Sequence, residues 1–353
     1  MKSFIFFDQK LPSYTYKFNS WKRYLAYRFF PNIKGNLKHH SELKKIKTKI
    51  NLYVWGVTLE EEGLDLSNFR NINVIRVEDG FIRSVGLGVR LTPPISLVAD
   101  PVGIYYNSTK PSYLEEILLR HSFPKELIER ARNIINTITN FNLTKYNIKE
   151  KKWKPPKTDK KIILVVGQVE TDMSIKYGSP YIKTNLQLLQ EVRKRNPHEY
   201  IVYKPHPDVA NKYKKGEIDQ KILFEYCNEV CPHTSIIDLI NHADEICVNT
   251  SLAGFEALIR GKKVICFGQP FYSGYGLTQD IYPVPRRNRN LTIEELVAGA
   301  IILYPVYVSI INNHSISPEE AIREIILIKK RPPIKLKFWN LIQKFVDPFI
   351  KIN

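Results

Sequence analysis

Four clusters of polar residues each follow a short apolar segment, and their side chains can do chemistry. The first comes after residues 73–77 and contains Glu78 and Asp79, with Arg83 and Ser84 close behind. A carboxyl group at the end of a strand can act as a general acid or base when partial burial raises its pKa. An arginine nearby can hold an anionic substrate through two hydrogen bonds. The alternative is an acidic turn that caps the next helix, and this cluster taken alone favours that alternative.

The second cluster follows the most apolar segment of the second half, residues 161–166, and contains Gln168, Asp172, Ser174 and Tyr177. The Asp172 carboxylate could attack an anomeric carbon or stabilise an oxocarbenium-like centre. It could instead cap a helix that begins beside it, because an aspartate side chain accepts hydrogen bonds from the free N–H groups of a first helical turn. The residues favour neither interpretation.

The third cluster combines two groups suited to a phosphate. Lys204 and His206 follow residues 199–203, and His206 stands between Pro205 and Pro207, which restrict the local backbone. A cation and a hydrogen-bond donor at a strand end can bind a phosphate, and the imidazole could also protonate a leaving phosphate oxygen. An isolated histidine is more often a structural residue. The flanking prolines and the neighbouring lysine favour a functional role.

The fourth cluster lies where a strand is expected to end at Val248 and a helix to begin near Ser251. The helix start presents free N–H groups beside the hydroxyls of Thr250 and Ser251, and Gly254 follows in the first turn. Such a helix start is a ready site for an anion. Glu256, further along the helix, could reach the hydroxyls of a ribose. The alternative for Ser251 is plain helix capping.

A loop rich in aromatic residues and glycine, residues 267–278, follows soon after and includes Tyr272. Its side chains could line the pocket of a sugar or a base. Arg286, Arg287 and Arg289 form a basic cluster beyond it that could meet a phosphate or a carboxylate.

Short strands and helices alternate in both halves of the chain, and this alternation positions the clusters. In the first half, strands are expected at 3–7, 51–55, 73–77 and 95–99, helices at 17–30 and within 113–138, and a loop or helix at 34–49. A charged segment with prolines, residues 150–160, is expected to link two domains. In the second half, strands are expected at 161–166, 199–203, 244–248 and 263–267, and helices at 181–195, 235–243 and 252–260.

This alternation predicts α/β domains with parallel sheets and right-handed crossovers. Two blocks joined by a linker predict two Rossmann-like domains that face each other across a cleft, with ligands at the carboxyl ends of the strands. The expected divisions are residues 1–150, residues 151–305, and a C-terminal part, 306–353, of helices with a basic tail.

The charge balance points to a polyanionic partner. The 353 residues contain 53 Lys+Arg against 35 Asp+Glu, a net charge of +18. Nucleic acid, anionic lipid and phosphorylated sugars would each suit this charge. Nucleic acid ranks last, because no nucleic-acid-binding module is recognisable and the bases are spread along the chain. Four cysteines exclude a disulfide scaffold, and no zinc-site spacing accompanies Cys227 and Cys231.

The end of the chain favours a membrane surface. Residues 329–353 interleave Lys and Arg with aromatic and aliphatic residues at helical spacing. This pattern is typical of a helix that lies on an anionic membrane, and the alternative is a last helix packed on the core. Neither a secretory signal nor an apolar stretch of the roughly 18 residues needed to span a bilayer is recognisable. A cytoplasmic protein is therefore expected.

The motifs together resemble the KpsC family of capsule polysaccharide proteins. The resemblance rests on EDGFIRSVGLG, PISLVAD, GIYYNSTKPSYLE, GQVETDMSIKYGSP, YKPHPDV and TSLAGFEALIRGKKVICFGQPFYSGYGLTQD, in one order over about residues 50–310. Members are β-Kdo transferases, which move 3-deoxy-D-manno-oct-2-ulosonic acid (Kdo) from CMP-β-Kdo. They usually carry two transferase modules in tandem. This chain has one, and its GQVETD segment is more similar to the second module.

The resemblance implies a GT-B-like fold of two Rossmann-type domains, with C-terminal helices that cross back between them. It also implies a transfer that retains the anomeric configuration, with no metal or other cofactor. Asp172 would be the nucleophile and Glu78 the acid/base, although the residues do not decide between Glu78 and Asp79. His206 and Ser251 would hold the CMP phosphate, and Glu256 would contact the ribose.

The resemblance further implies partners and a location. The acceptor would be a lipid-linked Kdo or another glycan, in capsule or lipopolysaccharide synthesis, on the inner membrane of a Gram-negative bacterium. Other assembly proteins of these pathways would be further partners. Two alternatives remain open: transfer of another CMP-activated nonulosonic acid, and a non-catalytic scaffold for polysaccharide assembly or export. The presence together of Glu78, Asp172 and His206 argues against the scaffold.

Overall fold

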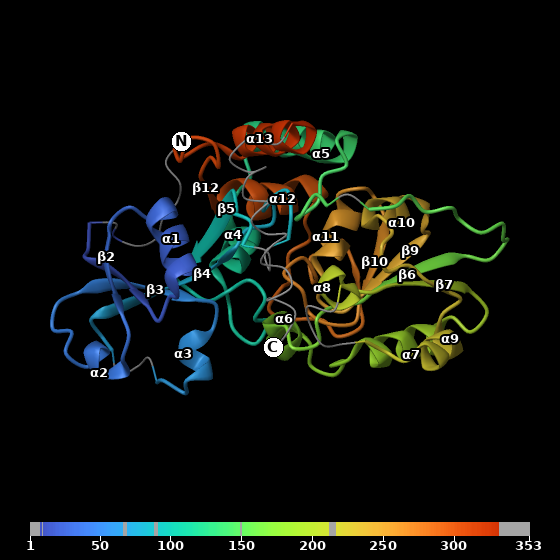
Figure 1. Ribbon diagram of the computed structural model, residues 1–353, viewed down its shortest axis with the longest axis horizontal. Coiled ribbons are helices and arrows are strands. Elements are labelled where there is room, and N and C mark those ends of the chain that lie inside the picture. The colour runs from blue at the N-terminus through green and yellow to red at the C-terminus, as the bar shows by residue number, and fades with distance from the viewer. Residues whose placement is uncertain are drawn as a thin grey trace.

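The computed structural model describes residues 8, 10–65, 69–87, 91–148, 150–211 and 217–331. The strand expected at 3–7 and the basic tail beyond 331 lie outside these residues. The described chain forms two six-stranded sheets, one in each half of the molecule (Figure 1).

The first sheet has the order β12-β5-β4-β3-β1-β2. Its strands are β1 (Ser13–Tyr16), β2 (Ile33–Leu37), β3 (Ile50–Trp55), β4 (Ile72–Asp79), β5 (Ser96–Asp100) and β12 (Pro305–Tyr307). Strands β1 to β4 run parallel, but β5 is antiparallel to β4 and β12 is antiparallel to β5. The prediction of a purely parallel sheet is therefore wrong at this edge. The described part of the connection from β4 to β5 contains no helix, so the chain turns back instead of crossing over.

The second sheet is parallel throughout, as predicted, with the order β11-β10-β9-β6-β7-β8. Its strands are β6 (Ile162–Val166), β7 (Tyr200–Lys204), β8 (Glu229–Val230), β9 (Glu245–Val248), β10 (Lys263–Cys266) and β11 (Gln279–Asp280). The β6 and β9 strands lie at its centre and are almost completely buried. Their carboxyl ends carry the second and fourth clusters to one edge of the sheet.

Helices cover both sheets. In the first half they are α1 (Ser20–Phe29), α2 (His40–Leu43), α3 (Thr58–Glu61), α4 (Tyr113–Arg120) and α5 (Lys125–Asn140). In the second half they are α6 (Met173–Gly178), α7 (Asn185–Arg195), α8 (Pro207–Ala210), α9 (Gln220–Tyr226), α10 (Ile236–His242) and α11 (Leu252–Leu258). The region 34–49 contains β2 and α2, because Ile33 and Leu43 bury apolar side chains that the many lysines concealed in the sequence pattern.

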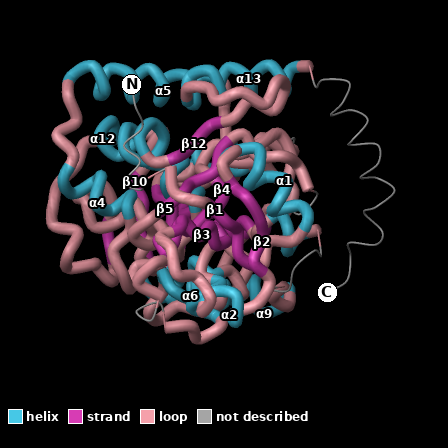
Figure 2. Tube along the Cα trace, turned by 90° about the vertical axis from the view of Figure 1, so that its left-hand side faces the viewer, coloured by secondary structure: helices cyan, strands magenta, loops and turns pink. Residues whose placement is uncertain are grey.

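The last described segments cross back to the first half, as expected. They are α12 (Ile293–Val297), a π-helix (Ala298–Leu303), β12 and α13 (Pro318–Lys330). Strand β12 joins the first sheet, and α13 lies alongside α5 in both views (Figures 1 and 2). The Arg130–Glu319 ion pair, 2.8 Å long, joins these two helices. Within the part of the chain that the structure describes, no helix is both long and apolar enough to cross a membrane.

One hydrophobic core is shared by the two halves. Phe81 follows strand β4 of the first sheet, and Phe271 follows strand β10 of the second. Their rings stack with centroids 4.3 Å apart. The expected linker 150–160 is also anchored to the second half: Trp153 is buried, and its indole N–H donates to Glu229 at 2.9 Å. These contacts join the two halves of the molecule near the ends of their strands.

Candidate active site

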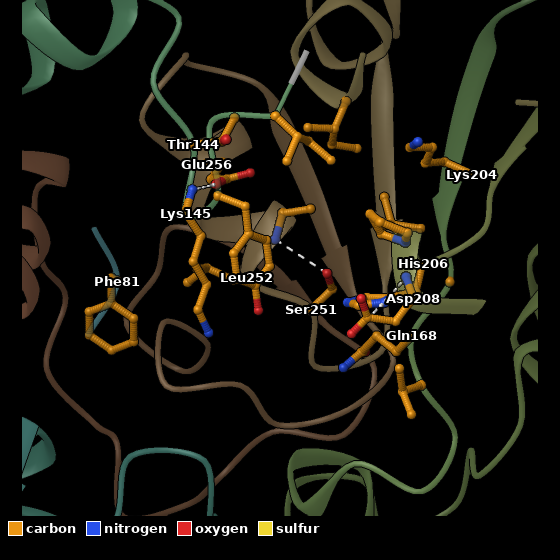
Figure 3. Close-up of a pocket in the computed structure, with 18 of the residues that line it drawn as sticks. Phe81, Thr144, Lys145, Gln168, Lys204, His206, Asp208, Ser251, Leu252 and Glu256 are labelled. Carbon is orange, nitrogen blue, oxygen red and sulfur yellow. Dashed lines mark hydrogen bonds and ion pairs between the residues drawn. The ribbon is translucent and has the colours of Figure 1, made fainter. Parts of the chain in front are cut away.

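A cavity of about 760 Å³ opens between the two halves, at the carboxyl ends of β4, β6, β7 and β9. Ligands of open α/β sheets bind at such edges. Figure 3 shows part of its lining. Ten of the residues predicted from the sequence to be catalytic or donor-binding line it: Glu78, Gln168, Asp172, Ser174, Lys204, His206, Pro207, Thr250, Ser251 and Glu256.

Glu78 is suited to proton exchange near neutral pH. Burial, and then repulsion by the Asp79 carboxylate, raise the pKa of Glu78 from 4.5 to about 7. The neighbouring Asp79 is engaged differently, since Arg83 Nε donates to its Oδ2 at 2.6 Å. This geometry favours Glu78 over Asp79 as the acid/base, because the Asp79 carboxylate is already engaged by Arg83.

Asp172 caps a helix and also faces the cavity. It is the N-cap of α6, and its Oδ1 accepts a hydrogen bond from the Ser174 N–H at 2.8 Å. The residue remains exposed and lines the cavity. The two interpretations left open by the sequence are thus compatible. One carboxylate oxygen fixes the orientation of the side chain while the other can meet a substrate.

His206 presents a neutral ring to the cavity. Its Nδ1 accepts a hydrogen bond from the Asp208 N–H at 3.1 Å, so the proton of the neutral imidazole is on Nε2. Burial lowers the pKa of His206, and this effect outweighs the opposing charges of Asp208 and Asp172. The Nε2–H group can therefore donate a hydrogen bond to an anion such as a phosphate oxygen.

A hydrogen-bond network joins three of the predicted residues across strand ends. The Gln168 side chain donates to Thr250 Oγ1 at 3.0 Å, and its Oε1 accepts from the Thr250 N–H at 2.8 Å. Thr250 Oγ1 also donates to Ser174 Oγ at 3.1 Å. The loops after β6 and β9 are thereby fixed to each other and to the helix that Asp172 caps.

Two predicted residues that do not line the cavity, Gly254 and Tyr272, support the position of Ser251. It caps α11, and its backbone carbonyl accepts a hydrogen bond from the fully buried hydroxyl of Tyr272. Gly254 leaves room for this hydroxyl, because a Cβ there would come within 2.2 Å of it. Gly254 and Tyr272 therefore support the helix start from outside the cavity lining, and their expected contact with the donor stays a prediction.

Three other predicted residues also lie outside the cavity lining. Arg83 is buried and donates to Asp79, to Ser84 Oγ at 2.9 Å and to the Thr92 carbonyl at 3.0 Å. The Ser84 hydroxyl donates to the Gly86 carbonyl. The Tyr177 hydroxyl donates to Glu61 at 2.6 Å, across to the other half. Arg83 thus has protein partners in this structure, and its expected contact with a substrate anion stays a prediction.

Lys204 lines the cavity, yet its charge is also matched by the protein. Its ammonium donates to Glu150 at 2.8 Å and to the Pro232 carbonyl at 2.9 Å. The basic cluster near 286 is similarly occupied: Glu115 pairs with Arg286 at 2.5 Å and with Arg287 at 2.8 Å. These cations form ion pairs and hydrogen bonds within the protein around the site.

Sequence reasoning missed the segment 141–148, which precedes the linker and crosses between the two halves (hereafter the interdomain strap). The carbonyl of Lys145 accepts hydrogen bonds from the N–H groups of Arg83 and Ser84, each at 3.2 Å. On the other side, the Lys145 N–H donates to Glu256 at 2.8 Å. The two asparagines of this segment were a local sequence signal. Asn142 and Asn147 adopt φ of 47° and 49°, a left-handed conformation that asparagine tolerates better than most residues.

Glu256 therefore has a role within the protein as well as facing the cavity. Burial raises the pKa of its carboxyl, against the charges of Arg260 and Lys145. One of its oxygens accepts from the strap, and the expected contact with a ribose remains a prediction. Among the described residues, no group of three or more His, Cys, Asp or Glu side chains could hold a metal ion. The expectation of a metal-independent reaction likewise stays a prediction.

A family model described as capsule polysaccharide biosynthesis protein matches residues 65–315. The chain belongs to this family. Among its members, the capsule polysaccharide modification protein LipA of Neisseria meningitidis serogroup A is 44% identical, over 88% of this chain and 44% of its own length. The lipopolysaccharide-processing protein LpsZ of Rhizobium meliloti is 36% identical, over 93% of this chain and 77% of its own length. The chain thus spans less than half the length of its LipA relative.

Two solved structures share the fold of this capsule-family chain. The β Kdo 2,7 transferase of Thermosulfurimonas dismutans KpsC is 53% identical, with a TM-score of 0.80, and the match covers 90% of this chain and 99% of that one. The β Kdo 2,4 transferase of the same KpsC is 30% identical, with a TM-score of 0.77, over 90% and 98% of the two chains. The expected KpsC-like family and GT-B-like fold are confirmed, and the matches support a glycosyltransferase.

Proposed function

We propose that the chain is a retaining β-Kdo transferase that moves Kdo from CMP-β-Kdo to a glycan acceptor. The observation that carries the proposal is a single interdomain cavity in which Glu78, Asp172 and His206 all face the same space. The likeness to two KpsC transferases supports the same conclusion. A scaffold for assembly or export would not require these three groups to converge.

Asp172 is the proposed nucleophile of the first displacement. One carboxylate oxygen forms a bond to the anomeric carbon of Kdo, and the bond from that carbon to the CMP phosphate oxygen breaks, so that the electron pair leaves with CMP. His206 Nε2–H and the N–H groups at the start of α11, beside Ser251, are placed to stabilise the departing phosphate.

Glu78 is the proposed base of the second displacement. The acceptor hydroxyl attacks the same carbon, its proton passes to the Glu78 carboxylate, and the bond to Asp172 breaks. Two successive displacements give net retention of configuration. A carboxyl group with a pKa of about 7 is well matched to this exchange at neutral pH.

The linkage and the location follow from the proposal as further parts of it. The identity to the 2,7 transferase exceeds that to the 2,4 transferase, 53% against 30%, which favours transfer to the 7-hydroxyl of a Kdo acceptor. A lipid-linked acceptor in capsule or lipopolysaccharide synthesis suits the basic, aromatic tail at 329–353. That tail would bind the anionic inner-membrane surface electrostatically from the cytoplasmic side.

The test is a transfer assay. CMP-Kdo is first made from Kdo and CTP with a CMP-Kdo synthetase, and the synthetase and its Mg²⁺ are then removed. When the purified chain, a synthetic Kdo acceptor and EDTA are added, a product one Kdo heavier is expected. Asp172→Ala should abolish it, whereas Asp159→Ala, in the exposed linker, should not. Product from another CMP-nonulosonate alone would change the sugar, and failure to bind CMP would overturn the transferase.

A further inference from the structure

The donor proposed above carries two anionic groups, a phosphodiester and the carboxylate of Kdo. The sequence offered Arg83 and Lys204 as their partners. The structure pairs Arg83 with Asp79 and pairs Lys204 with Glu150, and both bases are almost completely buried. Two side chains already matched by protein carboxylates are poor candidates for a second anion, because each would have to break a buried ion pair.

Other bases line the cavity, and they differ in how they are engaged. They are Lys145, Lys152, His206 and Lys329. Lys329 donates to the carbonyls of Asn142 and Phe141, at 2.9 and 3.3 Å, and Lys152 is exposed to solvent. For the Lys145 ammonium, the described part of the chain supplies no hydrogen-bond or ion-pair partner at contact distance. The ammonium lies 5.4 Å from the centroid of the Tyr146 ring.

The position of the Lys145 side chain in the cavity also suits a contact with the donor. In Figure 3 its side chain leaves the backbone contact with Glu256 and extends between Phe81 and Ser251. Its charge acts on Glu78, Asp79 and His206. Lys145 thus shares one cavity with the acid/base, with the group proposed for the phosphate, and with the stacked rings of Phe81 and Phe271.

We propose that the Lys145 ammonium binds the carboxylate of the donor sugar and so selects a sugar acid over a neutral sugar. The inference rests on the proposed transferase function and specifies how that site recognises its substrate. In Kdo the carboxylate is attached to the anomeric carbon itself. A group that binds it therefore fixes the reacting carbon relative to Asp172 and Glu78.

The electrostatics of the site require such a cation. Without it, a substrate carboxylate would enter a cavity that is already lined by Glu78, Asp79, Asp172 and Asp208. Repulsion between like charges is strong where water is partly excluded. Burial alone would lower the pKa of Lys145, but its interactions with Tyr146, Asp79 and Glu78 outweigh burial and raise that pKa. The side chain therefore stays protonated and ready to receive an anion.

The side chain can be changed without releasing the strap. The backbone of Lys145 is held by Glu256 on one side and by the Arg83 and Ser84 N–H groups on the other, and none of these contacts uses the ammonium. Lys145→Met keeps the length of the side chain and removes only its charge. Lys154→Met is the matched control, since Lys154 is an exposed residue of the linker and does not line the cavity.

The experiment compares the donor with CMP, which lacks the sugar carboxylate. For wild type, Lys145→Met and Lys154→Met, we would measure CMP affinity by calorimetry and kcat/KM for CMP-Kdo at saturating acceptor. Lys145→Met should lower kcat/KM for the donor at least tenfold while CMP affinity changes less than threefold. Lys154→Met should leave both unchanged. If the methionine variant does not fold, Lys145→Gln replaces it, with CMP binding as the check of the fold.

Two outcomes would overturn the inference. An equal loss of CMP affinity and donor turnover in Lys145→Met would assign Lys145 to the phosphate. An unchanged kcat/KM would leave the lysine without a part in recognition. Failure of the proposed function is seen separately, as absence of transfer from CMP-Kdo by the wild-type chain.

Discussion

The ammonium of Lys204 lies 2.8 Å from the carboxylate of Glu150, and the two side chains are only 3% and 12% exposed. Strand β7 ends at Lys204, and Glu150 stands where the chain leaves the interdomain strap. The pair therefore fixes the strap against the second sheet at the wall of the cavity. A lysine that the sequence favours as a phosphate ligand is here paired with a protein carboxylate.

Removing one member of this pair should destabilise the protein strongly. Lys204→Met leaves the Glu150 charge buried and unpaired, which typically costs about 3–5 kcal/mol. The double variant Lys204→Met/Glu150→Leu should regain most of the lost free energy of unfolding, measured by urea denaturation. It should also still bind CMP. Loss of CMP binding in a stably folded double variant would show instead that Lys204 contacts the donor.

Glu78 should control the pH dependence of transfer. Its pKa is raised to about 7 by burial and then by Asp79, and Lys145 and Lys22 oppose the shift. The second displacement needs the carboxylate, so kcat/KM for the acceptor should rise with pH up to about 7 and then level off. Glu78→Gln should reduce the rate about 10²- to 10⁴-fold and remove this pH dependence. A wild-type profile that is flat between pH 5 and 8 would exclude this role.

The same group should make the folded state less stable above neutral pH. A carboxyl whose pKa is raised by folding stabilises the protein below its unfolded pKa of 4.5, and this contribution is lost as pH rises through about 7. The loss is at most about 3 kcal/mol, and smaller because Glu78 faces an open cavity. Glu78→Gln should therefore be more stable than wild type at pH 8 but not at pH 4. The test is the urea midpoint at both pH values.

Asp172 should separate catalysis from helix capping. Asparagine is as good an N-cap as aspartate, whereas alanine lacks the acceptor and typically costs about 1 kcal/mol. Asp172→Asn should retain the stability of wild type, and Asp172→Ala should lose about that amount. Both should lose transfer, because neither supplies a carboxylate. An asparagine variant that keeps its stability and its activity would leave Asp172 as a cap alone.

Gly254 should be intolerant of a methyl group. A Cβ at this position would lie 2.2 Å from the Tyr272 hydroxyl, which holds the Ser251 carbonyl. Gly254→Ala should lower the free energy of unfolding by about 1–3 kcal/mol, as overpacked cores do, and should weaken CMP binding. Gly35→Ala is the matched control, since its Cβ would meet Tyr14 at an ordinary 3.5 Å. Equal stability of the two variants would contradict this packing argument.

The sequence determined much of the candidate site. Strand ends can be recognised locally, from a buried β-branched segment followed by polar residues, and parallel strands bring their carboxyl ends to one edge. For this reason Glu78, Asp172, His206 and Ser251 could all be placed at one cavity before any contact was known. The same periodicity predicted strands β6, β7, β9 and β10 and helices α7, α10 and α11 of the second half, but not the short β8, β11, α8 and α9.

Only the tertiary structure decided which charges are available to a ligand. Lys204 and Glu150 are 54 residues apart, and the Lys145 N–H and Glu256 are 111 apart, so no local pattern indicates either contact. The direction of β5 was equally hidden, because a strand's periodicity is the same in either orientation. Residue types select the groups that can do chemistry. Packing decides which cations are already paired with protein carboxylates, and so leaves Lys145, and not Arg83 or Lys204, to face the cavity with its charge unmatched by the described residues.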